Sequence, residues 1–154
     1  SRISVESAQE MYQAAVEASD HADIEILCAA VADYTPAHKE DHKIKREKTG
    51  AMQLDLVPTQ DIAAALGKKK RGKQIMIGFA LETDNEEVNA IGKCERKNLD
   101  FIVMNSLNDK NACFQHDTNK ITIFDRDGKK TAFNLKPKKE VAKDIIDHAL
   151  SILK

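Results

Sequence analysis

Three short apolar segments, separated by stretches with helical signals, constrain the fold of this chain more than any other feature. They cover residues 24–32, 74–81 and 101–104. Apolar runs of this length, without alternating polar residues, are typical of strands that are buried on both faces of a parallel sheet. Parallel neighbours need a long crossover connection, which is usually a helix. The pattern therefore predicts an α/β fold in which residues 24–32 form a buried central strand.

Helix and turn signals around these segments complete the expected architecture. Ser7 and Thr83 begin capping-box patterns, and Thr59 is expected to cap a helix that Gly67 ends. Two apolar segments around Asp127-Gly128 predict an antiparallel hairpin. We expect a three-layer, Rossmann-like, mostly parallel sheet with this hairpin near its C-terminal end. The positions of the last two helices that are expected to face the core are Val88, Ile91, Leu99, Val141, Ile145, Ala149 and Ile152.

The segment that follows the first apolar run breaks the alternation of strands and helices. Residues 34–48 lack apolar periodicity and are mostly charged or polar, which predicts a loop or flap. Met52, Leu54 and Leu56 then alternate with polar residues, which predicts a half-buried strand. The basic stretch 68–73 is expected to be a solvated connection between a helix and the second apolar strand.

Composition narrows the classes of protein that this chain can represent. Its 154 residues fit one α/β domain over 1–154, and 24 Lys and Arg against 25 Asp and Glu exclude a dedicated nucleic-acid binder. No apolar run could span a bilayer and no leader is visible, so neither a membrane nor a secreted protein is expected. The three widely spaced cysteines favour reduced thiols in core positions and a cytoplasmic location. Since the chain starts at Ser1 without methionine and has six glycines, we expect a piece of a longer protein.

Candidate ligand-binding residues follow the carboxyl ends of the expected strands, where open α/β sheets bind their ligands. Asp33 and Asn105 occupy such positions, although a turn or capping role explains Asp33 equally well. Lys93 and Lys97 are one helical turn apart and suit a polyanion, but a solvated helix face is the better explanation of this pattern alone. Basic neighbours could lower the pKa of Cys94, but no nucleophile pattern accompanies it.

Two apparent motifs are rejected. Residues 67–73 match G-x-x-x-x-G-K, but Gln74 stands where a P-loop needs Ser or Thr, and the segment precedes a strand instead of following one. His38 and His42 are four residues apart but lack the glutamate of a zinc-protease helix, so loop histidines are the simpler interpretation.

Several motifs spread over the chain resemble the pattern of one known family. The first is A-A-V-A-D-Y-T-P at residues 29–36, followed by K-I-K-R at 43–46. The others keep the family's order and cover 56–62, 78–83, 93–105 and 114–119. In these motifs the chain resembles phosphopantothenoylcysteine synthetase, the ligase half of a bacterial bifunctional enzyme of coenzyme A biosynthesis. Gln60 departs from the pattern, because the family usually has proline there.

The resemblance implies a ligase that joins 4′-phosphopantothenate to L-cysteine. In this family the pantothenate carboxylate attacks the α-phosphate of CTP, which releases pyrophosphate and forms an acyl-cytidylate. The amine of cysteine then displaces CMP. Attack on an α-phosphate needs cations around the triphosphate, so Mg²⁺ or Mn²⁺ is expected as well. The resemblance does not decide whether the nucleotide is CTP or ATP, although bacterial members of the family generally use CTP.

Matching motifs assign roles residue by residue. Asp33 would contact the nucleotide or its metal, Lys43 would meet the phosphates from the flap as the catalytic residue, and Phe79 would wall the cytosine pocket. Lys93 and Lys97 would complete a phosphate cradle. The other implied CTP-binding positions lie at the pocket floor and at the start of a helix, namely Ala29, Gln60, Asp61, Ile62 and Ala63.

The family's glycine-rich N-terminal segment has no counterpart among these motifs, and neither does its flavin-binding module, so no FMN is expected. A chain without that segment is expected to bind CTP but to be catalytically impaired. A homodimer is expected because members of the family dimerise. Two other functions stay open: a non-catalytic fragment and a generic nucleotide-binding module.

Overall fold

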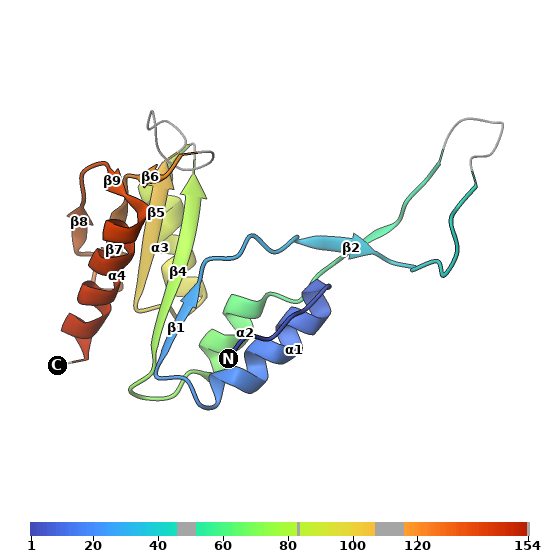
Figure 1. The fold of residues 1–154 in the computed structure, drawn as a ribbon, viewed down its shortest axis with the longest axis horizontal. Helices are drawn as coiled ribbons and strands as arrows, with labels where there is room; N and C mark the ends of the chain where they lie inside the picture. The colour runs from blue at the N-terminus through green and yellow to red at the C-terminus, as the bar shows by residue number, and fades with distance from the viewer. Residues whose placement is uncertain (46–51, 83, 107–115, 154) are drawn as a thin grey trace.

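A computed structural model of the chain describes residues 1–45, 52–82, 84–106 and 116–153, and a five-stranded sheet forms its centre (Figure 1). The strand order is β1-β4-β5-β7-β8. Pairing is parallel from β1 to β5 and antiparallel from β5 to β8, so the expected mostly parallel sheet with a C-terminal hairpin is confirmed. The strands are β1 (Ile24–Leu27), β4 (Ile75–Glu82), β5 (Phe101–Ser106), β7 (Thr122–Asp125) and β8 (Lys130–Ala132).

The hairpin between β7 and β8 turns at the predicted Asp-Gly dipeptide. Gly128 has a φ of 84°, and its N–H donates to the carbonyl of Asp125 over 3.0 Å. Glycine adopts this left-handed conformation without the steric penalty of a Cβ. The turn residue is therefore the local cause of the predicted hairpin.

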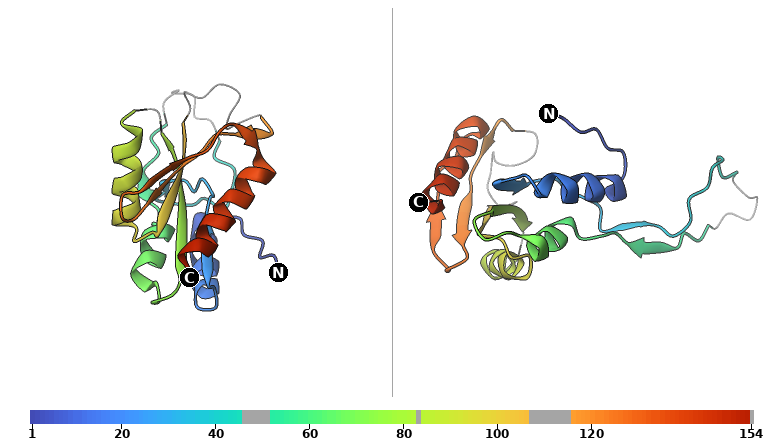
Figure 2. Two further views of the ribbon diagram at one scale, coloured as in Figure 1. Left: turned by 90° about the vertical axis from the view of Figure 1, so that its left-hand side faces the viewer. Right: turned by 90° about the horizontal axis from the view of Figure 1, so that it is seen from below.

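Helices cover both faces of the sheet and complete the three layers that the sequence predicts (Figure 2). The helices α1 to α3 pack on one face, and α4 packs on the other. Their bounds are α1 (Ala8–Ser19), α2 (Ile62–Lys69), α3 (Glu86–Arg96) and α4 (Lys138–Ile152). As the capping box predicts, the hydroxyl of Ser7 accepts the N–H of Glu10 at the start of α1.

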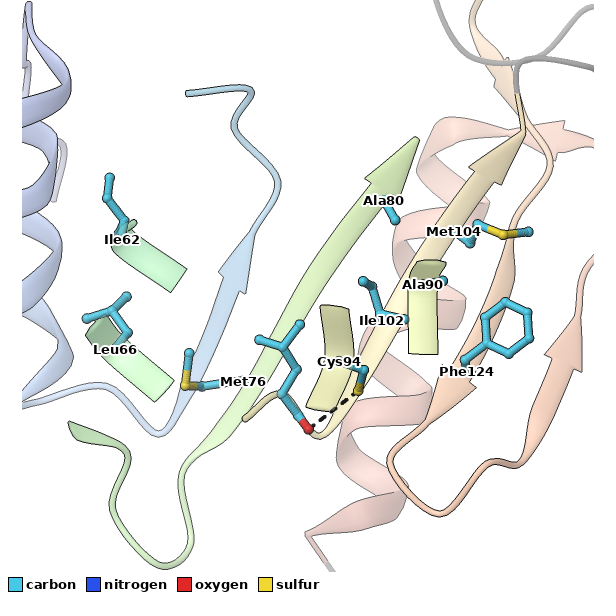
Figure 3. Close-up of a cluster of buried hydrophobic side chains, with 10 residues drawn as sticks. Ile62, Leu66, Met76, Ala80, Ala90, Cys94, Ile102, Met104 and Phe124 are labelled. Carbon is cyan, nitrogen blue, oxygen red and sulfur yellow. Dashed lines mark hydrogen bonds between the residues drawn. The ribbon is translucent and has the colours of Figure 1, made fainter. Parts of the chain in front are cut away.

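Two apolar cores hold these layers together. The core under α2 and α3 includes Leu66 and Cys94, each 2% exposed (Figure 3). The core under α4 includes Ile145. On β4, Met76 faces the first core and Ile77 faces the second. Both faces of this strand are therefore apolar, which explains why its sequence shows no polar alternation.

Two expected core positions are wrong. Val88 is 73% exposed and Ile152 is 42% exposed. The buried residues of α3 are Ala90 and Cys94, and Val88 lies two residues from Ala90, which is about 200° around a helix and so on the outer side. Ile152 lies in the last turn of α4, beyond Ala149, the last buried residue of that helix.

The largest difference from expectation concerns the chain between β1 and α2. Among the described strands β1 pairs only with β4, so it is an edge strand and not a central one, and it ends at Leu27 instead of near residue 32. The chain then leaves the sheet and forms an arm, the antiparallel pair β2 (Tyr34–Pro36) and β3 (Leu56–Pro58) (Figure 1). Part of the predicted loop is thus a strand.

The half-buried strand expected at Met52–Leu56 is wrong as well. Met52 is 65% exposed, and every residue of β2 and β3 is exposed. The alternation of apolar and polar residues suits a strand with one covered face, but the arm extends away from both cores. Its apolar side chains therefore have no core to cover them in this chain.

The basic connection between α2 and β4 is more than a solvated turn. Lys70 Nζ lies 2.6 Å from Asp100 Oδ1, and the Lys70 side chain is only 9% exposed. The Arg71 guanidinium donates to the carbonyls of Ser19 and Ala22.

A second small sheet, β6 (Thr118–Asn119) with β9 (Lys136–Pro137), precedes α4. Within the described parts of the chain, none of the helices is long and apolar enough to cross a membrane.

Candidate functional site

A cavity of about 430 Å³ opens at the carboxyl end of β1, on the side of the sheet that α1, α2 and α3 cover. The resemblance assigned ten residues to a nucleotide site, and this cavity brings together all of them except Lys43. The predicted residues that line it are Ala29, Asp33, Gln60, Asp61, Ile62, Ala63, Phe79, Lys93 and Lys97. They come from four separate parts of the chain, which only the fold places side by side.

Two lysines form the cationic wall of the cavity. Lys93 lies in the last turn of α3 and Lys97 is its C-cap residue, where cations interact favourably with the helix dipole. Lys97 Nζ is 3.2 Å from Asp61 Oδ1. Lys97 is therefore held beside the start of α2 by its ion pair with Asp61.

Asp61 is the N-cap of α2, a role that the sequence assigned to Thr59. Its Oδ1 accepts the N–H of Ala64 over 3.0 Å. Burial raises the pKa of Asp61, but the Ala64 hydrogen bond and the ion pair with Lys97 outweigh it, so the pKa lies below its usual value of 3.8. The carboxylate thus stays ionised near neutral pH and joins the helix cap to the lysine.

Thr59 has a different function from the one expected. Its hydroxyl donates to the carbonyl of Ala32 over 2.6 Å, and its N–H donates to the carbonyl of Asp33 over 2.9 Å. These two bonds fasten the segment after β1 to the segment before α2. The sequence did not reveal this contact, because the two segments are separated by the whole arm.

A close approach between α2 and α3 fixes the position of Lys97. Gly67 lies inside α2 and does not end the helix as expected. Its missing side chain makes room for the end of α3. A Cβ built at Gly67 would lie 2.0 Å from the carbonyl oxygen of Lys97. The side chain of Asn98 donates to the Gly67 carbonyl over 2.7 Å. Gly67 therefore permits the contact that places the lysine.

The floor of the cavity is apolar. Phe79 and Gly78 come from β4, and Leu99 and Ile102 lie beneath them. A Cβ at Gly78 would meet Leu99 Cδ1 at 2.5 Å, so this glycine also serves close packing. Phe79 is half-buried and packs partly against the core under α4, so the cavity has an aromatic residue at one edge and two lysines at another, which suits a ligand that has a flat ring and several negative charges.

Lys43 does not line this cavity. It is an exposed residue of the arm, past β2, and the arm extends away from the sheet (Figure 1). The sequence placed Lys43 near the phosphates through its motif, but the fold of one chain does not bring it there. Arg46 and Thr83, which belong to neighbouring motifs, lie outside the described residues.

The described residues form neither a metal-binding cluster nor a cysteine site apart from this cavity. Among the described residues no group of three His, Cys, Asp or Glu side chains could hold a metal ion. Cys94 is buried, and burial raises its pKa to about 11, so it is a core residue. Cys28 is exposed and lines the cavity, so the expectation that it fills the core is wrong. Cys113 lies outside the described residues.

Comparison with known proteins gives the same family from sequence and from structure. The profile of the DNA/pantothenate metabolism flavoprotein C-terminal domain matches residues 1–153. One relative, a cysteine/cysteine sulfinic acid decarboxylase from an unknown prokaryotic organism, is 54% identical over 98% of this chain and 42% of its own length. The coenzyme A biosynthesis bifunctional protein CoaBC of Bacillus subtilis (strain 168) is 42% identical over 99% of this chain and 37% of its own length.

Among solved structures, the C-terminal domain of the coenzyme A biosynthesis bifunctional protein CoaBC is similar to this chain with a TM-score of 0.76 and 35% identity. The alignment covers 98% of this chain and 67% of that domain. The chain thus spans about two fifths of the curated relatives that it matches.

Proposed function

On the premise that the chain belongs to the family of the DNA/pantothenate metabolism flavoprotein C-terminal domain, we propose that it serves as a phosphopantothenate–cysteine ligase. It is homologous to the C-terminal domain of CoaBC. The observation that carries the proposal is the cavity that combines two lysines, the start of α2, a carboxylate and an aromatic ring at the carboxyl edge of the sheet. In this proposal the cavity binds CTP, which activates 4′-phosphopantothenate for reaction with L-cysteine.

The charge of the cavity suits a nucleoside triphosphate. Lys93 and Lys97 would contact phosphate oxygens, and Ile62 and Ala63 begin α2, where backbone N–H groups favour anions. Phe79 would pack against the base, and the backbone around Gln60 lies where it could contact the base or ribose. Triphosphate binding would then replace the Asp61 carboxylate as the partner of Lys97.

The proposed reaction has two steps, both displacements. A carboxylate oxygen of 4′-phosphopantothenate attacks the α-phosphorus of CTP, the bond to the bridging oxygen breaks, and pyrophosphate leaves with that electron pair. The amine of cysteine then attacks the acyl carbon, the bond from this carbon to the oxygen that bridges to phosphorus breaks, CMP leaves with that oxygen and the electron pair, and the amine loses a proton. Lys93 and Lys97 would stabilise the negative charge that grows on the leaving pyrophosphate.

A divalent metal is part of the proposal only through the nucleotide. Asp33 offers one carboxylate in the cavity, and the described residues provide no cluster of three ligands. Asp33 would be a protein ligand of a Mg²⁺ or Mn²⁺ ion that binds together with the triphosphate. Such an ion would supply charge neutralisation of the triphosphate.

We propose that two copies of the chain dimerise through the arm that β2 and β3 form. Tyr34 is 61% exposed, Leu56 is 53% exposed and Val57 is 41% exposed, and a two-stranded ribbon is marginally stable by itself. Pairing with the arm of a second copy would cover these side chains. Lys43 keeps its proposed role as a phosphate ligand if the arm bends toward the cavity or a second copy supplies the residue.

The expected reduced state of the thiols supports a cytoplasmic location as part of this proposal. Among the cysteines that the structure describes, Cys28 and Cys94 are free thiols. A thiol product also favours a reducing compartment, because an oxidising one would couple it to other thiols.

The main alternative is a nucleotide-binding module without chemistry. Titration calorimetry with CTP and with ATP measures binding, and release of pyrophosphate in the presence of CTP, 4′-phosphopantothenate and cysteine measures turnover. CTP binding with pyrophosphate release supports the ligase. CTP binding without release supports the alternative and agrees with the impaired fragment that the motifs predict. Absence of CTP binding contradicts both.

Variants locate the binding site. Because a hydrogen bond to a charged group contributes about 1.5–3 kcal/mol, Lys93→Gln and Lys97→Gln should each lower CTP affinity by roughly tenfold or more. Lys68→Gln is the matched control, since Lys68 is an exposed lysine in the last turn of α2 that does not line the cavity. Equal affinity of all three variants would contradict the assignment of the cradle.

A further inference from the structure

The turn after α3 is built around Asn98, which directly follows the lysines of the cavity wall. Asn98 has a φ of 54°, a left-handed conformation that glycine adopts most easily and asparagine tolerates. Its N–H donates to the carbonyl of Glu95 over 3.1 Å, and the N–H of Leu99 donates to the carbonyl of Cys94 over 3.0 Å. These two bonds form a Schellman motif, in which glycine is the usual left-handed residue. The helix cap therefore does not explain why this position carries a side chain.

The side chain of Asn98 makes two contacts that glycine could not make. Its Nδ2 donates to the carbonyl of Gly67 in α2 over 2.7 Å, and its Oδ1 accepts from the guanidinium of Arg126 in the turn between β7 and β8. A guanidinium has only donors, so it binds the oxygen of the amide and leaves Nδ2 for Gly67. One half-buried side chain thus joins α2, the end of α3 and the hairpin.

The backbone of Arg126 is itself anchored to the sheet. Its N–H donates to the carbonyl of Asp100 over 2.9 Å. The carboxylate of Asp100 accepts the N–H of Met76 over 2.7 Å and pairs with Lys70, whose Nζ lies 2.6 Å from Oδ1. The group that orients the amide of Asn98 therefore starts from a fixed point at the end of β4 and β5.

This joint lies outside the cavity but connects its two anion-binding walls. Asn98 does not line the cavity. One wall is the start of α2 at Ile62, and the other is the end of α3 with Lys93 and Lys97. Because α2 is a single helix of eight residues, fixing Gly67 also fixes where its first turn lies. The chain of phosphates in a triphosphate can reach both walls, whereas a single phosphate reaches only one.

We propose that Asn98 is a positioning residue of the nucleotide cavity: it holds the start of α2 and the lysines of α3 at the spacing that a triphosphate needs, and Arg126 orients its amide. This inference rests on the proposed ligase function. A supporting residue outside the cavity acts on the ligand only through the groups that it holds in place. Loss of the Asn98 side chain should therefore affect a ligand that spans both walls more than one that does not.

Titration calorimetry with CTP and with CMP makes this comparison. Asn98→Gly keeps the left-handed turn and removes both side-chain bonds. CTP affinity should fall about fivefold or more, as for the loss of one hydrogen bond, and CMP affinity should change less than about twofold. Asn85→Gly is the matched control, because Asn85 begins α3 with a φ of 47°, makes no side-chain cap hydrogen bond and does not line the cavity. It should leave both affinities unchanged.

Three further variants separate the two contacts and carry the test if Asn98→Gly does not fold, which a circular dichroism melt shows. Asn98→Asp tolerates the same backbone and can accept from Arg126, but it has no N–H for the carbonyl of Gly67. It should weaken CTP binding as Asn98→Gly does. Arg126→Ala should also weaken CTP binding, whereas Arg126→Lys keeps a donor and should restore most of the affinity.

Unchanged CTP affinity of Asn98→Gly or Asn98→Asp overturns the inference, since the side chain would then serve the turn alone. Equal losses of CTP and CMP affinity overturn it as well, because they indicate a general change of the fold. Both outcomes require a wild-type chain that binds CTP. A wild-type chain that binds no nucleotide contradicts the proposed function itself, and this inference with it.

Discussion

Replacing Gly67 with alanine should destabilise the protein although it introduces a better helix former. Gly67 lies within α2, where alanine is favoured over glycine by about 1 kcal/mol. The new Cβ would lie 2.0 Å from the carbonyl oxygen of Lys97, whereas real Cβ contacts are essentially never shorter than 3.0 Å. The clash is with backbone, which cannot rotate away as a side chain can.

The magnitude follows from these two opposing effects. Forcing an extra methyl group into a packed contact costs about 1–3 kcal/mol, and a rigid backbone neighbour places this case at the upper end. After subtraction of the gain in helix propensity, Gly67→Ala should lose about 2 kcal/mol of unfolding free energy. For a domain of this size, that corresponds to a melting temperature lower by about 4–8 °C.

Urea denaturation followed by circular dichroism measures the loss. Gly72→Ala is the matched control, because no atom lies within 4 Å of a Cβ built there, and its unfolding midpoint should equal that of the wild type. The same displacement moves Lys97, so Gly67→Ala should also weaken CTP binding whereas Gly72→Ala should not. Equal midpoints for the two variants would refute the claim that close helix packing positions the lysine.

Two further predictions concern ionisable groups of the cavity. Asp61→Asn should keep the cap on Ala64, whereas Asp61→Ala should lose about 1 kcal/mol of stability. Because the pKa of Asp61 is lowered in the folded state, the charge of its carboxylate stabilises the fold above pH 3.8. In urea titrations, the difference in unfolding free energy between wild type and Asp61→Asn should therefore shrink as the pH falls through the folded-state pKa. A difference that grows on acidification would contradict the ion pair with Lys97. Thiol labelling at pH 8 with peptide mapping should modify Cys28 rapidly and Cys94 only after unfolding, since burial raises the Cys94 pKa to about 11. CTP should slow the labelling of Cys28, and rapid labelling of Cys94 in the folded protein would contradict its burial.

Patterns of local origin were predictable. The capping of α1 by Ser7 and the turn at Gly128 depend on residues within a few positions of each other. The apolar runs of β4 and β5 fixed the fold class, because only strands buried on both faces need such runs. The resemblance of the motifs to a known family named nine of the residues that line the cavity.

Contacts between distant segments were not predictable in the same way. Thr59 looked like a helix cap and Gly67 like a helix end, because both interpretations consider only neighbours in sequence. In the fold, Thr59 bonds to the segment after β1, and Gly67 makes room for the carbonyl of Lys97. Such roles depend on the distance between elements, which the local sequence does not encode.

The sequence by itself determined the fold class and the hairpin, because periodicity and turn residues are properties of a linear chain, and its resemblance to a known family named nine residues that line the cavity. Only the tertiary structure decided that β1 is an edge strand, that Lys43 stands on an arm away from the cavity, and that Asn98 joins α2 to the end of α3. These facts depend on where the chain leaves the sheet after Leu27 and on how α2 packs against the end of α3. Packing of surfaces far apart in sequence sets both, so no local pattern could reveal them.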